Sequence, residues 1–96
     1  MRLQSERFLT HLRASRNYST HTLRAYGKDL EAFVLRYPGL EPGAIERVHV
    51  RAFLADLQKD VALSRATILR RMAALRSFFK FLRSNGFLKG NPVFGV

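Results

Sequence analysis

The sequence predicts an all-α fold, a compact four-helix orthogonal bundle, from three observations. Apolar residues recur at three- and four-residue steps. No stretch alternates apolar and polar residues between hairpin turns. The 96 residues are 47 % hydrophobic and include eight Phe, enough for one small core. We therefore expect residues 1–96 to form a single domain.

A first helix is predicted over residues 2–15. Its apolar face consists of Phe8, Leu9 and Leu12. The second helix is predicted to start at Ser19, whose hydroxyl can accept a hydrogen bond from the first turn, and to end at Pro38 and Gly39. Its apolar stripe consists of Leu23, Tyr26, Leu30, Phe33, Val34 and Tyr37.

The third and fourth helices are predicted over about 46–60 and from Ser64 to a left-handed Gly86. The start of the third helix is not marked by a strong cap. Its inward residues are Val50, Phe53, Leu54 and Leu57. The stripe of the fourth helix consists of Ile68, Met72, Leu75, Phe79 and Leu82. The Pro/Gly cluster at 38–43 is interpreted as a loop between helices.

The charge of the chain points to a polyanionic partner. Seventeen Lys and Arg oppose seven Asp and Glu, which gives a net charge of +10 and a pI near 11.3. Residues 1–28 hold six basic and one acidic side chain, 29–60 hold four and six, and 61–96 hold seven and none. Two basic blocks around a slightly acidic middle indicate a defined basic surface.

Several other classes are excluded by composition. With no Cys and three scattered His, the chain offers neither disulfides nor a usual zinc site. No carboxylate pair or phosphate-binding glycine loop suggests a stand-alone enzyme. No apolar run of membrane-spanning length occurs, and charges interrupt the N-terminal segment. We expect a cytoplasmic chain with no metal, no small-molecule cofactor and no membrane contact.

The second and fourth helices open with the same pattern, Ser-x-x-Thr followed by an aliphatic residue, at Ser19 and at Ser64. Capping alone explains this pattern, and so does phosphate binding at the positive end of each helix. On the fourth helix the predicted outward residues are Ala66, Thr67, Arg70, Ala73, Ala74 and Ser77, flanked by Arg71, Arg76 and Lys80. On the second helix they are His21, Arg24, Ala25 and Lys28, with Thr22 to one side.

Small outward residues with a few cations let another surface approach closely, as the DNA major groove would. The residues predicted to contact duplex DNA from this pattern are Ser19, His21, Arg24, Lys28, Ser64, Arg65, Thr67 and Arg70. Asp29 and Arg76 are expected to form an ion pair between the two helices.

Short motifs in a fixed order also point to a family. They are Tyr18-Ser19-Thr20-His21-Thr22, Ala25-Tyr26, Asp29-Leu30 with Phe33, Val50-Arg51-Ala52-Phe53-Leu54, Leu63-Ser64, Thr67-Ile68, Arg71-Met72, Leu75-Arg76-Ser77-Phe78-Phe79, Gly86-Phe87 and Asn91-Pro92. Together they resemble the N-terminal core-binding, SAM-like domain of tyrosine recombinases, of the Xer type or from phage integrases. The resemblance implies half of a C-shaped clamp on double-stranded DNA, with the second and fourth helices in the major groove. It implies DNA contact at Thr22, Arg24, Lys28, Arg70, Arg71 and Ser77.

The resemblance also implies that this chain does not itself cut DNA. Proteins that resemble it cleave a phosphodiester with a tyrosine held in a following catalytic domain. That domain is absent here, and the apolar Phe94-Gly95-Val96 end suggests a fragment of a longer protein. His21 and Arg24 match an active-site spacing of the family, which we interpret as coincidence. The resemblance further implies other recombinase protomers as partners, in a tetramer on DNA.

Two other interpretations stay open. A stand-alone helix-turn-helix regulator would need a short turn between its two helices, but the third helix intervenes here. A basic interaction module for protein partners or anionic membranes would use exposed Phe81, Phe87 and Phe94. The first of these, Phe81, lies off the apolar stripe, and we expect the C-terminal segment with the other two to fold over it.

Overall fold

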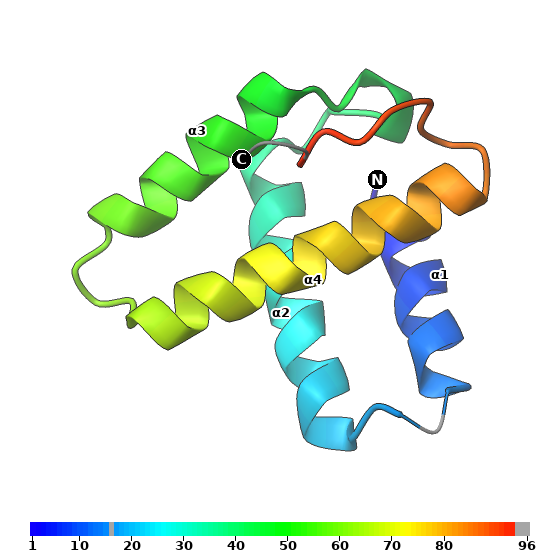
Figure 1. Ribbon diagram of the computed structural model, residues 1–96, viewed down its shortest axis with the longest axis horizontal. Coiled ribbons are helices and arrows are strands. Elements are labelled where there is room, and N and C mark those ends of the chain that lie inside the picture. The colour runs from blue at the N-terminus through cyan, green and yellow to red at the C-terminus, as the bar shows by residue number, and fades with distance from the viewer. Residues whose placement is uncertain (16, 94–96) are drawn as a thin grey trace.

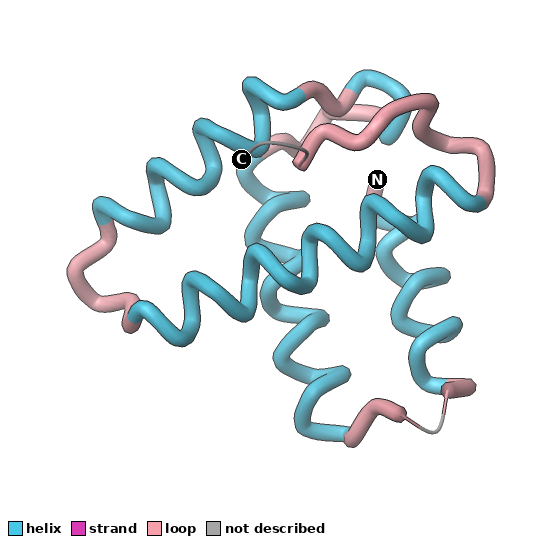
Figure 2. Tube along the Cα trace, viewed as in Figure 1, coloured by secondary structure: helices cyan, strands magenta, loops and turns pink. Residues whose placement is uncertain are grey.

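The computed structural model describes residues 1–15 and 17–93 and shows the predicted all-α class. The elements are α1 (Arg2–Arg13), α2 (Thr20–Arg36), the short 3₁₀ helix η1 (Pro42–Ala44), α3 (Arg47–Lys59) and α4 (Arg65–Ser84). Figure 2 shows helices and connecting loops, and no strand occurs within those residues. The first helix ends two residues before its predicted end, whereas the other three match closely.

The last helix is the one against which the others assemble. In Figure 1, α4 runs across the front of the molecule and crosses α2 at a steep angle, while α1 lies beside α2. α4 packs against α1, α2 and α3, and α1 also packs against α2. The molecule measures 35 × 30 × 24 Å. This arrangement is the predicted orthogonal bundle.

Aromatic side chains form the centre of the core. The Phe33 ring of α2 meets the rings of Phe53 in α3 and Phe79 in α4 edge-on, with centroids 5.2 and 5.7 Å apart. A second group joins α1 to α4, because Phe8 lies 5.5 Å from Phe78. All five rings are buried. One core therefore involves every α-helix.

The helix ends follow from local chemistry that the sequence revealed only in part. Gly86 follows α4 with a φ of 79°, the predicted left-handed conformation that only glycine adopts without strain. At the start of α3, where no strong cap was expected, the Glu46 backbone N–H donates to His49 Nδ1 at 2.8 Å. The imidazole thus takes the part that Glu or Gln plays in an ordinary capping box.

For the described part of the C-terminal segment, the expectation that it covers Phe81 is not met. The Phe81 ring instead lies 5.4 Å from the rings of Phe8 and His11, both from α1. Phe87 is half-buried against the core, and Phe94 lies outside the described residues. Because α1 shields Phe81, the module interpretation loses its main exposed aromatic anchor.

Candidate nucleic-acid interface

The two helices with the Ser-x-x-Thr opening start with the same hydrogen bonds. In α2, Ser19 Oγ accepts a hydrogen bond from the Thr22 backbone N–H at 3.1 Å and lies 3.0 Å from Thr22 Oγ1. In α4, Ser64 Oγ accepts from the Thr67 N–H at 3.1 Å and donates to Thr67 Oγ1 at 3.0 Å. The capping prediction is confirmed at both helices. Each start also carries the positive end of a helix dipole.

A row of basic side chains follows the start of α2. His21, Arg24 and Lys28 are exposed, and their three- and four-residue spacing places them on one face of the helix. Ala25, which was predicted to face outward with them, is half-buried. The exposed face of the first half of α2 is therefore basic.

The exposed face of α4 is rotated from its predicted position. Ala74 was expected to face outward, but it is fully buried. Arg76 and Lys80, expected on the flanks, are exposed. Because α4 packs against three helices, it buries a wider arc than its predicted stripe, including Phe78. α4 contains six basic residues and no acidic one, so its solvent face is basic wherever it is charged.

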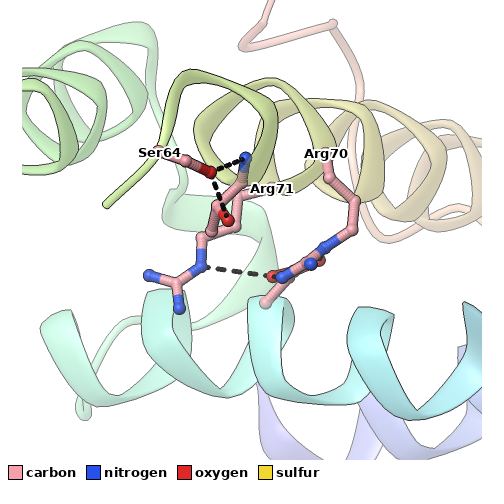
Figure 3. Close-up of polar contacts among 5 residues, drawn as sticks. Ser64, Arg70 and Arg71 are labelled. Carbon is pink, nitrogen blue, oxygen red and sulfur yellow. Dashed lines mark hydrogen bonds and ion pairs between the residues drawn. The ribbon is translucent and has the colours of Figure 1, made fainter. Parts of the chain in front are cut away.

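A buried carboxylate lies between α2 and α4. Asp29 is 0 % exposed and is held by the two consecutive arginines of α4. Arg70 donates from Nε to Oδ2 at 2.9 Å and from Nη2 to Oδ1 at 2.7 Å, and Arg71 Nε donates to Oδ1 at 3.2 Å. Figure 3 shows Arg70 and Arg71 extending from α4, near Ser64 at the start of that helix.

The predicted ion pair of Asp29 with Arg76 is therefore wrong. Arg76 lies on the exposed face of α4, whereas Arg70 and Arg71 lie nearer the crossing with α2. The sequence did place Asp29 at the α2–α4 contact. Which arginine pairs with Asp29 depends on the rotation of α4 about its own axis. That rotation differs from the one predicted from the apolar stripe.

The Asp29 carboxylate raises the pKa of two neighbouring groups. The hydrogen bonds to Asp29 raise the pKa of the Arg70 guanidinium above its ordinary value. Burial, the neighbouring Tyr18 and the Asp29 charge raise the pKa of the Tyr26 hydroxyl. Both arginine and tyrosine thus keep their protons at neutral pH, and neither is a candidate for proton transfer.

The predicted contact residues differ in accessibility. The exposed ones are Ser19, His21, Arg24, Lys28, Ser64, Arg65 and Arg70. The half-buried ones are Thr22, Thr67, Arg71 and Ser77. Ser77 lines a groove between α1 and α4 together with His11 and Phe81. Arg76, Lys80 and Arg83 are exposed cations outside the predicted set of contact residues, although the lack of acidic residues after Asp60 signalled them.

Two features are absent from the described part of the chain. No three His, Cys, Asp or Glu side chains of residues 1–15 and 17–93 gather where they could hold a metal ion. Among the helices formed by these residues, none has the length and apolar character needed to cross a membrane.

The chain is similar to one described domain family and to several named proteins. Residues 5–86 match the family described as phage integrase, N-terminal SAM-like domain. Proteins named tyrosine recombinase XerC are similar: that of Thermodesulfovibrio yellowstonii is 41 % identical over 86 residues, covering 90 % of this chain and 28 % of the relative. That of Roseiflexus castenholzii is 41 % identical over 96 residues, covering 97 % and 30 %. That of Oceanobacillus iheyensis is 37 % identical over 95 residues, covering 96 % and 31 %.

This chain thus spans less than a third of the length of each of these three relatives. No solved structure matches it significantly.

Proposed function

The chain belongs to the family of phage integrase N-terminal SAM-like domains, and from this premise we propose that it is a non-catalytic domain that binds duplex DNA within a site-specific tyrosine recombinase. Its task is to clamp the recombination site during integration, excision or chromosome dimer resolution. The names of its relatives support the recombinase assignment. The basic faces of α2 and α4 support the assignment to DNA.

The observation that carries the proposal is the charge of α4. This helix of twenty residues has six cations and no acid. Packing of the core does not explain this charge, because Arg65, Arg76, Lys80 and Arg83 are exposed. An ordinary solvated helix mixes both signs of charge. The exposed cations of α2 extend the same basic character to the helix that α4 crosses. A surface of this kind attracts a phosphate backbone.

The proposed contacts combine two chemistries. Backbone N–H groups at the capped starts of α2 and α4 bind phosphate oxygens, while the cations contact phosphates or guanine edges. The residues proposed for these contacts are Ser19, His21, Thr22, Arg24, Lys28, Ser64, Arg65, Thr67, Arg70, Arg71 and Ser77.

DNA cleavage is proposed to belong to another part of a longer protein. The three relatives described above are more than three times as long as the region they share with this chain. The three tyrosines of this chain do not suit nucleophilic attack, because Tyr18, Tyr26 and Tyr37 are half-buried against the core and the Tyr37 hydroxyl donates to the His49 carbonyl at 2.9 Å. The proposed partners are double-stranded DNA and other recombinase protomers, which assemble as a tetramer on it.

The first prediction tests duplex binding through α2. The double variant Arg24→Ala with Lys28→Ala is expected to bind a labelled duplex more weakly than the parent chain. Its salt dependence is expected to be shallower by about two log units of affinity per log unit of salt, about 0.9 for each lost phosphate contact. Fluorescence anisotropy titrations at several salt concentrations measure both quantities.

The matched control is Arg51→Ala with Lys59→Ala, which removes the same charge from exposed positions of α3. This control variant should change the salt dependence of duplex affinity far less than the α2 variant does. Equal slopes for the two double variants would show that net charge alone drives binding and would refute the assignment to α2. Sedimentation with anionic vesicles separates DNA binding from membrane binding. The vesicles are expected to bind less of the protein than the duplex does.

A further inference from the structure

The buried carboxylate of Asp29 is an unusual residue to find beside a basic surface. It has no exposed area, and a charge removed from water is tolerated only when ion pairs and hydrogen bonds replace the lost hydration. Here three hydrogen bonds from Arg70 and Arg71 replace it. An apolar residue would fill a helix contact with no such requirement, so the position calls for an explanation beyond packing.

The geometry of Arg70 supplies such an explanation for Asp29. A guanidinium offers two edges, each able to donate two parallel hydrogen bonds. Asp29 occupies the edge formed by Nε and Nη2, and the adjacent edge, formed by Nη1 and the other Nη2 hydrogen, remains free among the described residues. None of the hydrogen bonds among residues 1–15 and 17–93 uses Nη1, and the side chain is 41 % exposed. The remaining edge fits two phosphate oxygens, or O6 and N7 of guanine.

Arg71, the second arginine, sets the net charge of the cluster that it forms with Asp29 and Arg70. Arg70 and Asp29 alone would form a neutral pair with little attraction for a phosphate. Arg71 also donates to Asp29 and is only 21 % exposed at its side chain, so it adds positive charge while facing inward. The three residues together carry one net positive charge at the contact between α2 and α4.

We propose that Asp29 is a positioning residue for DNA recognition, which holds the Arg70 guanidinium in one orientation with its free edge toward the duplex, while Arg71 keeps the cluster positive. This inference rests on the proposed function. An arginine that is already ordered loses less side-chain entropy when it binds. Asp29 therefore strengthens binding to a polyanion despite its own negative charge.

Replacement of Asp29 by Asn gives opposite expectations for the two possible roles. If only net charge matters, removal of a negative charge makes duplex binding tighter. If Asp29 positions Arg70, the Asp29→Asn variant binds about fivefold more weakly, the loss expected for one side chain that must be ordered on binding. Asp56→Asn is the matched control, because Asp56 also accepts from an arginine, Arg36 Nε at 2.8 Å, but is exposed. The control is expected to bind as the parent does or slightly more tightly.

Circular dichroism at the titration temperature establishes whether Asp29→Asn is folded. If it is folded and binds as tightly as the parent or more tightly, the proposal is overturned. If it is unfolded, Arg70→Lys decides, because lysine keeps the charge beside Asp29 but cannot donate along two edges. A folded Arg70→Lys variant is expected to lose affinity, and parental affinity would overturn the proposal.

Nuclear magnetic resonance of the guanidinium groups gives an independent readout on the parent chain. The Arg70 Nε–H is expected to exchange with water more slowly than that of exposed Arg51, since the former is bonded to a buried acceptor. Exchange as fast as at Arg51 would also overturn the proposal. A parent chain that shows no salt-dependent duplex affinity would instead refute the proposed function, and this outcome is distinct from the others.

Discussion

At the scale of single residues, the starts of α2 and α4 show how much a short polar pattern can determine. A Ser at the cap and a Thr three residues later form two hydrogen bonds with each other in both helices. This result needed no tertiary information, because capping involves only neighbours in sequence. The sequence therefore predicted both starts correctly.

The cap of α4 is expected to contribute measurable stability. Replacement of Ser64 by Ala leaves the Thr67 N–H without its acceptor, and we expect a loss of about 1 kcal/mol in the free energy of unfolding, measured by urea denaturation. Ser84→Ala, at the exposed end of the same helix, serves as the control and should change stability by less than about 0.5 kcal/mol. Equal stability of the two variants would mean that the cap is dispensable.

The start of α3 marks the limit of such local rules. Its cap comes from the His49 imidazole, a residue type that is also common in cores and at binding sites. Nothing in the sequence distinguished these roles. The same holds for Asp29, whose position at a helix contact was predicted but whose two partners were not.

At the scale of elements, the rotation of α4 about its axis was the main quantity that the sequence did not determine. A single apolar stripe defines one buried direction, but α4 packs against three helices, which makes the buried arc wider and moves its centre. Phe78 and Ala74 lie in this additional arc, and both are fully buried. Small size at Ala74 thus reflects packing within the protein rather than close approach of DNA.

This conclusion leads to a prediction about two alanines of α4. Ala74→Leu is expected to lower the free energy of unfolding by about 1 to 3 kcal/mol, because the added carbons have no space. The same change at exposed Ala66 is the control and should have little effect. Thermal and urea unfolding compare the two. If Ala74→Leu were as stable as Ala66→Leu, the outward orientation expected from the sequence would be correct after all.

At the scale of the whole molecule, the predicted four-helix bundle is confirmed because its evidence was distributed along the entire chain. Each helix had its own periodic stretch, and Pro or Gly residues marked several of the boundaries. The way in which helices cross depends on the joint fit of many side chains, so the detailed contacts between α2 and α4 were accessible only from the structure.

The aromatic centre makes a prediction for the whole domain. Phe33 touches rings from α3 and α4, so Phe33→Ala is expected to lower the free energy of unfolding by about 3 to 5 kcal/mol, a large part of the total for a domain of this size. Leu35→Ala, exposed on the same helix, is the control. Far-ultraviolet circular dichroism and tyrosine fluorescence should report one shared transition. Separate transitions for the two signals would contradict a single cooperative unit.

The central place of α4 has a consequence for how the protein is made. α4 is synthesised after α1, α2 and α3, yet it supplies the surface that these three helices all cover. Until it has left the ribosome, Phe8 and Phe33 lack the rings of Phe78 and Phe79 that bury them. The nascent chain therefore cannot complete the core of this domain until α4 has emerged.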